Sequence, residues 1–144
     1  MARIPHTFTA SYILFIKDEQ VLLSRRFQTG FEDGNYSLPA GHTEPGETFT
    51  VALIREIEEE TGVELSPEHV TVSHIMHRRA VSRENIDVFF VAKNWTGTPK
   101  NLEPEKCDDL SWFPLNSLPQ NIIPYVRQAI EHSRAGILYS EHGF

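Results

Sequence analysis

The chain has little cysteine and no long apolar run, and both absences narrow what it can be. Cys107 is the only cysteine in 144 residues, so no internal disulfide can form, in agreement with a reducing compartment. No stretch approaches the roughly 18 apolar residues that span a bilayer, and residues 1–16 lack a signal-peptide cleavage pattern. We therefore expect a cytoplasmic protein with no membrane partner. Cys107 has no motif around it, which favours a packed or partly exposed residue over a catalyst.

Positive charge is also scarce. Lys and Arg number 13 against 20 Asp and Glu, which gives a formal net charge of −7 at pH 7. This balance argues against a broad contact with a nucleic-acid polymer, because such contacts depend on basic side chains that neutralise phosphates. A small phosphorylated ligand is different, because a few carboxylates can bind divalent metal ions that in turn hold phosphates.

The pattern of apolar residues predicts a single α/β domain over residues 1–144, a length that suits one hydrophobic core. Strands are expected at residues 7–16 and 21–27, joined as a hairpin, and at 70–77, 86–92 and around Trp112 and Phe113. For these two aromatic residues, core packing is favoured over stacking on a base. Helical spacing predicts a C-terminal helix that contains Tyr125, Val126, Ala129 and Ile130.

A second helix is expected to begin near Thr48 and to end at Gly62. Thr48 or a neighbour can cap its first turn, and Gly62 tolerates the left-handed backbone that often follows a last turn. A rotation of about 100° per residue brings together one apolar face, which consists of Leu53, Ile54 and Ile57.

The same rotation decides what the four acids of this helix can do. Glu56, Glu59 and Glu60 converge within about 100° of one another, whereas Glu58 points nearly the opposite way. Like charges at this spacing destabilise a helix by a few tenths of a kcal/mol per pair. A solvated acidic face is the ordinary interpretation, and a shared divalent cation is the alternative, because Mg²⁺ prefers carboxylate oxygen, water and phosphate.

The segment from Gly41 to Val63 resembles a known family motif. Gly41, five residues, Glu47, seven residues and then the run from Arg55 to Val63 match the Nudix box, G-x5-E-x7-R-E-U-x-E-E-x-G-U with U aliphatic, at every defined position. The resemblance implies the Nudix α/β/α sandwich with a mixed β-sheet. It also implies hydrolysis of a nucleoside diphosphate linked to another group, with Mg²⁺ or Mn²⁺ as the cofactor.

Position by position, the resemblance also implies roles within the box. Glu56, Glu59 and Glu60 correspond to metal ligands, and one of them can act as the general base. Arg55 and Glu47 look like the pair that orients this cluster, which makes Glu59, Glu56, Arg55 and Glu47 the expected catalytic residues. Gly41 is expected to lie in a sharply turning loop before the helix, and its carbonyl is a further expected ligand, because glycine lets the backbone approach a metal closely.

Outside the box, residues 101–115 resemble the segment that follows it in MutT-like nucleoside triphosphate pyrophosphohydrolases. In those enzymes an additional glutamate from this segment reaches the metal, and the resemblance makes Glu105, or else Glu103, the candidate here. It is equally expected that this acid is simply exposed to solvent.

Arg25 and Arg26 are adjacent on a strand, so only one can face a site. A structural or surface role is expected for His74 and His77, because the sequence near them lacks the further ligands of a zinc site. Residues 28–35 are expected to form a mobile loop.

Substrate choice is less constrained by these residues. The leading hypothesis is a nucleoside or deoxynucleoside triphosphate cleaved to monophosphate and pyrophosphate, by an enzyme that is a monomer or a homodimer. A nucleotide sugar or a dinucleoside polyphosphate is the alternative substrate. A binding module that senses a nucleotide without hydrolysing it is the alternative of another class, although such modules usually lose carboxylates of the box and this chain keeps them.

Overall fold

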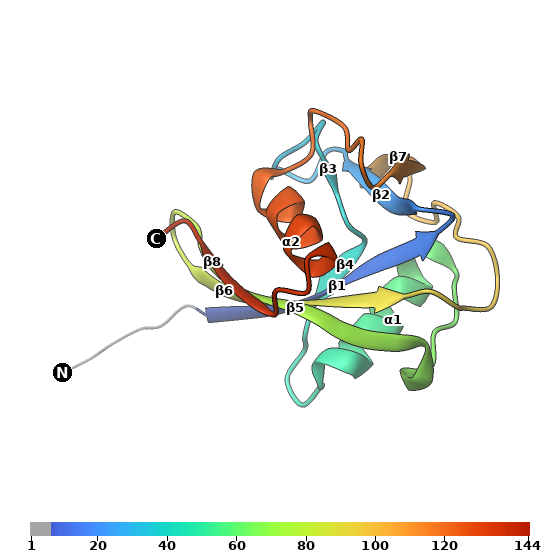
Figure 1. Cartoon of the computed structure of the whole chain (residues 1–144), viewed down its shortest axis with the longest axis horizontal. Helices are drawn as coiled ribbons and strands as arrows, with labels where there is room; N and C mark the ends of the chain where they lie inside the picture. Colours follow the sequence, from blue (N-terminus) through green and yellow to red (C-terminus); the bar gives the residue numbers. More distant parts are fainter. Residues whose placement is uncertain (1–6) are drawn as a thin grey trace.

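The computed structural model describes residues 7–144, so the first six residues of the predicted domain lie outside it. Within these residues, two α-helices lie on either side of a mixed β-sheet (Figure 1). The elements are β1 (Thr7–Lys17), β2 (Gln20–Arg26), β3 (Tyr36–Ser37), β4 (Ala40–His42), α1 (Phe49–Thr61), a 3-10 turn (Pro67–His69), β5 (Val70–Arg79), β6 (Glu84–Ala92), β7 (Cys107–Pro114), α2 (Pro124–Arg134) and β8 (Tyr139–His142). Neither helix is long and apolar enough to cross a bilayer.

The sheet divides at the hairpin of β1 and β2. These strands pair only at Ile16 with Val21 and at Lys17 with Gln20, next to their turn. Beyond that point β1 pairs in parallel with β6 and antiparallel with β4, while β2 pairs antiparallel with β7 and β3. β5 joins β6 to the edge strand β8. The predicted hairpin is confirmed, and its strands separate toward their far ends.

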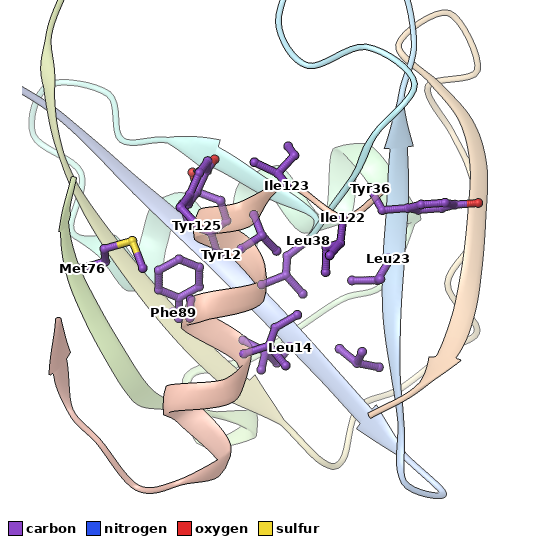
Figure 2. Packing of buried hydrophobic residues seen from close by; sticks show 14 of the residues in the cluster. Tyr12, Leu14, Leu23, Tyr36, Leu38, Met76, Phe89, Ile122, Ile123 and Tyr125 are labelled. Atoms are coloured by element: carbon purple, nitrogen blue, oxygen red, sulfur yellow. The ribbon is translucent and has the colours of Figure 1, made fainter. Parts of the chain in front are cut away.

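Alternation along β1 builds a core on each face of the sheet. Tyr12 and Leu14 pack in the cluster that contains the apolar face of α2, whereas Ile13 and Phe15 pack in the cluster that contains α1. Figure 2 shows Tyr12 and Leu14 beside α2, with Phe89 of β6. Both helices therefore bury an apolar stripe against one sheet, and the predicted α/β/α sandwich is confirmed.

Helix α1 begins and ends as its sequence predicts. The side chain of Thr48 accepts a hydrogen bond from the backbone N–H of Val51 over 3.1 Å, and Gly62 follows the last turn with φ of 77°. Leu53 and Ile57 are fully buried. Burial of this stripe leaves the acidic side of α1 available to the solvent and to the neighbouring strand β4.

Other predicted core residues also take their expected places. Trp112 packs against the core on the α1 side and stacks on Trp95, with ring centroids 6.1 Å apart, and Phe113 packs against the core on the α2 side. His74 is buried, and each ring nitrogen lies 2.7 Å from an oxygen, one of Ile137 and one of Ser140. The prediction of a structural or surface role for His74 is confirmed, and the role is structural.

Candidate active site

A cleft of about 870 Å³ opens where β1 and β2 separate. The sheet contributes Ala10 and Tyr12 from β1 and Ser24 from β2, and further wall comes from β4, α1 and the segment before β7. The acids of the Nudix box that border the cleft are Glu56, Glu59 and Glu60. Glu58 is exposed and does not border it, so the predicted division of the acidic helix into two faces is confirmed.

Gly41 is the point where β4 and α1 touch. The sequence predicts a loop here, but Gly41 lies within the short strand β4, which pairs with β1. A Cβ at this position would overlap Cγ and Cδ of Glu56. Because glycine has no Cβ, the carboxylate of Glu56 can reach the backbone of β4 at position 41.

Arg55 holds two of the box glutamates. Its Nε and Nη2 donate to the two carboxylate oxygens of Glu47 over 2.7 and 2.8 Å, and its Nη1 donates to Oε1 of Glu56 over 2.8 Å. The hydrogen bonds from Arg55 and from the backbone of Glu44 lower the pKa of Glu47 to about 2. Those from Arg55 to Glu47 and Glu56 raise the pKa of the guanidinium. These hydrogen bonds fix the rotamers of Arg55, Glu47 and Glu56.

The other two acids of this face differ in exposure. The side chain of Glu59 is 55% exposed, and its Oε1 lies 3.8 Å from Nη1 of Arg55. Glu60 is turned toward β4, where Oε1 accepts a hydrogen bond from the backbone N–H of Ala40 over 3.3 Å. Burial raises the pKa of Glu60, and the charges of Glu56 and Glu103 raise it further. One acid is thus open to the solvent of the cleft and one is enclosed beside another carboxylate.

Glu103, rather than the preferred candidate Glu105, approaches these acids. Glu103 borders the cleft, and its pKa is raised by burial and by the charges of Glu56, Glu105 and Glu59, against the opposing charge of Lys106. Glu105 is exposed and does not border the cleft. The backbone N–H groups of Lys106 and Cys107 both bond to the carbonyl of Glu103, so a tight turn separates the two acids and directs Glu105 outward.

The donor set suits a hard divalent cation. Carboxylate oxygens of Glu56, Glu59 and Glu60 and the backbone of Gly41 are the kind of ligand that Mg²⁺ and Mn²⁺ prefer. An enclosed carboxylate with a raised pKa beside further acids is a position where a positive charge would be stabilising. As they stand, no three acidic, histidine or cysteine side chains of residues 7–144 form a ready-made metal cage. Glu56 and Glu60 point to Arg55 and to Ala40 instead.

Arg25 and Arg26 both border the cleft, although strand alternation predicted only one. β2 is irregular between them in its pairing with β7, which disturbs the alternation. Arg25 donates to Asp108 over 2.7 Å. Arg26 donates to the carbonyl of Phe31 and so holds the loop of residues 28–35, in which Thr29 and Gly30 also bond to Asp33.

Sequence reasoning missed a group of polar residues in the sheet wall of the cleft. Arg78 and Asp87 form a buried ion pair across β5 and β6, and the guanidinium lies over the ring of Tyr125. Arg78 and Tyr125 border the cleft, as does His42 of β4. The available signal was Asp87, a charged residue near the start of the otherwise apolar run at residues 86–92. Its partner at position 78 could be found only once the strands were paired.

The NUDIX domain family profile matches residues 5–133. The chain therefore belongs to the Nudix family, whose members are hydrolases that act on pyrophosphate bonds. Among curated relatives, NAD-capped RNA hydrolase NudC of Stutzerimonas stutzeri (strain A1501) is 29% identical over 115 residues, which cover 80% of this chain and 39% of NudC. The human 8-oxo-dGDP phosphatase NUDT18 is 35% identical over 88 residues, 60% of this chain and 26% of that protein. The chain thus spans less than half the length of these relatives.

Solved structures agree with this assignment. The crystal structure of a MutT NUDIX hydrolase from Burkholderia pseudomallei has a TM-score of 0.80 and 28% identity, and the match covers 87% of this chain and 96% of that one. The solution structure of the E. coli ORF135 protein has a TM-score of 0.74 and 20% identity over 91% of each chain, which supports the fold alone. The resemblance of residues 41–63 to the Nudix box is thereby extended to most of the chain.

Proposed function

We propose that this protein is a Mg²⁺- or Mn²⁺-dependent hydrolase of nucleoside or deoxynucleoside triphosphates, which releases the nucleoside monophosphate and pyrophosphate. The observation that carries the proposal is that Glu56, Glu59 and Glu60 line one wall of a cleft large enough for a nucleotide, where Glu56 lies against the backbone of Gly41. Complete retention of the box carboxylates favours catalysis over a sensing module.

The exposure of each side chain and its hydrogen-bond partners indicate its role in the proposed reaction. When a divalent cation is bound, it neutralises phosphate oxygens and lowers the pKa of a coordinated water. Of Glu56, Glu59 and Glu60, Glu59 is the most open to the solvent of the cleft, so we assign it the role of base that accepts the proton of the attacking water. Arg55, clamped by Glu47, holds Glu56 in place. Glu56, Glu59, Glu60 and the Gly41 carbonyl would hold the cation, with Glu103 in the place first considered for Glu105.

The choice of a triphosphate rests on the segment around Glu103, which resembles that of MutT-like pyrophosphohydrolases. The relatives' names set the alternatives, because NudC is named for NAD-capped RNA and NUDT18 for 8-oxo-dGDP. The expectation that no nucleic-acid polymer is a partner therefore stays a prediction, as do the cytoplasmic location and the monomeric or homodimeric state. A nucleotide sugar or a dinucleoside polyphosphate remains the alternative substrate.

Metal dependence and product identity test the proposal together. Without a cation the acids repel a polyphosphate, so excess EDTA should abolish turnover of a triphosphate, and Mg²⁺ or Mn²⁺ should restore it. Product chromatography should find monophosphate and pyrophosphate in equal amounts. Full activity in excess chelator would contradict the mechanism, and diphosphate with orthophosphate as products would contradict the site of cleavage.

A further inference from the structure

The sheet wall of the cleft contains a buried ion pair that no step of the proposed hydrolysis uses. Nε of Arg78 donates to Oδ2 of Asp87 over 2.7 Å, and these side chains are 7% and 0% exposed. The guanidinium carbon lies 3.9 Å from the centroid of the Tyr125 ring. The hydroxyl of Tyr125 lies 2.9 Å from that of Tyr12, and Figure 2 shows the two side chains close together near Phe89.

Stability alone is a weak reason for a pair of this kind. Desolvation of two charges costs several kcal/mol, and well-packed apolar residues in their place are often as stable or more stable. The hydrogen bonding of the pair is also incomplete, because Oδ1 of Asp87 is buried without a partner among residues 7–144. A polar group retained in the wall of a binding cleft, at the expense of apolar packing, suits recognition of a ligand.

The strand register leaves room for a ligand beside this pair. Ala10 of β1 is flanked by His42 of β4 on one side and by Asp87 of β6 on the other. Paired residues share a face of the sheet, so the small side chain of Ala10 lies in a row between two larger polar ones. Ala10, His42 and Arg78 all border the cleft.

The guanidinium of Arg78 has N–H groups that donate to no residue of the described chain. Beside the bond from Nε, Nη2 lies 2.9 Å from the side-chain oxygen of Asn85 once that amide is oriented to satisfy both of its ends. A guanidinium carries more N–H groups than two partners use, and Nη1 has no acceptor within residues 7–144. Since Asp87 already neutralises the charge of Arg78, the remaining donors suit a neutral carbonyl better than a phosphate. For phosphate, the cleft offers Arg83 and Lys106.

We propose that Arg78 determines base specificity, and that its free N–H groups donate to a keto nucleobase, with guanine as the preferred base. Guanine presents two adjacent acceptors, O6 and N7, which match a guanidinium fork, whereas adenine places an amino donor where guanine has O6. The inference rests on the proposed function in that a nucleotide must occupy the cleft. It adds that the base lies against the sheet wall formed by Arg78, Tyr12 and Ala10.

Binding of the two purine monophosphates tests this without turnover. In EDTA, GMP and AMP are titrated into ¹⁵N-labelled protein, and the side-chain Nε–H signal of Arg78 is followed, assigned by its absence in Arg78→Lys. The wild type should bind GMP at least about tenfold more tightly than AMP, and GMP should shift the Arg78 signal. Arg78→Lys keeps the charge next to Asp87 but loses the fork, so the ratio should fall to within about threefold.

Arg79→Lys is the matched control, because Arg79 is the exposed neighbour in β5 and does not border the cleft; it should keep the wild-type ratio. If Arg78→Lys does not fold, Arg78→Met with Asp87→Leu removes both charges together and should also lose the preference. Equal binding of GMP and AMP by the wild type, no measurable binding of either, or a ratio unchanged in these variants would overturn the inference.

The outcome is separable from that of the proposed function. GMP preference that depends on Arg78, in a protein that hydrolyses no triphosphate, would support the base contact and refute the proposed reaction. Equal hydrolysis of GTP and ATP, unaffected by Arg78→Lys, would support the reaction and refute the base contact.

Discussion

Glu58 and Glu59 are neighbours in the sequence but face different surroundings, so they form a matched pair for substitution. Glu59 borders the cleft and Glu58 does not. Glu59→Gln should keep the fold and lower kcat by at least about 100-fold, because the loss of a general base has effects of this order. Glu58→Gln should stay close to wild type. Steady-state kinetics with the preferred triphosphate measure both, and equal damage from the two variants would refute the assignment of the catalytic face.

Glu47 gives the fold a specific response to acid. Its pKa in the folded protein is about 2, below the ordinary value of 4.5, so its pairing with Arg55 stabilises the folded state above pH 4.5. That contribution is lost as the pH falls from about 4.5 toward 2. Urea unfolding should therefore show Glu47→Gln less stable than wild type near neutral pH, with a difference that shrinks below about pH 4. A difference that is the same at both pH values would contradict this.

At the scale of the elements, the contact of β4 with α1 positions the acids. The Cβ of Gly41→Ala would overlap the side chain of Glu56, and displacement by about 1 Å can lower a rate by about 100-fold. We expect kcat to fall about 10- to 100-fold with the circular dichroism spectrum unchanged. Gly46→Ala is the control, because nothing lies near its Cβ but φ is 85°; it should cost about 1 kcal/mol of stability and keep kcat. Unchanged kcat in Gly41→Ala would show that this close approach is unnecessary.

Local patterns predicted α1 well because its determinants are local. The cap at Thr48, the stop at Gly62 and the buried Leu53 and Ile57 all follow from spacing within one helix. Strand β4 was expected to be a loop, because its three residues are too short to show alternation and it exists through pairing with β1. The irregularity between Arg25 and Arg26 likewise arises from pairing with β7.

Contacts between distant residues could not be predicted in the same way. Arg78, Asp87 and Tyr125 belong to β5, β6 and α2, and only the register of the strands brings them together. The preference between Glu103 and Glu105 depended on a tight turn whose hydrogen bonds join residues 103, 106 and 107. The placement of the box residues could be predicted because they lie on one helix and one neighbouring strand, whereas the walls that select a substrate come from the whole fold.

For the whole molecule, the net charge of −7 and the acidic wall of the cleft both oppose the binding of a polyphosphate. A polyphosphate approaches an anionic protein against repulsion unless cations accompany it, and salt screens such interactions over about 10 Å at 0.1 M. KM for a triphosphate should therefore fall as Mg²⁺ rises toward saturation of the substrate. A KM that is independent of Mg²⁺ at constant ionic strength would contradict a role for the cation in holding the substrate.

The most direct test of the central claim is a comparison of kcat/KM across a substrate panel, measured by product chromatography. The panel contains the canonical nucleoside triphosphates, 8-oxo-dGDP, dinucleoside polyphosphates, ADP-ribose, nucleotide sugars and NAD-capped RNA. The box acts on the diphosphate that these compounds share, so selection must come from the cleft walls. At least one triphosphate should exceed every other class by about tenfold or more, which needs only about 1.4 kcal/mol of transition-state discrimination, and should yield pyrophosphate. A nucleotide sugar, ADP-ribose or NAD-capped RNA at the head of the panel would contradict the triphosphate assignment and leave the family assignment intact.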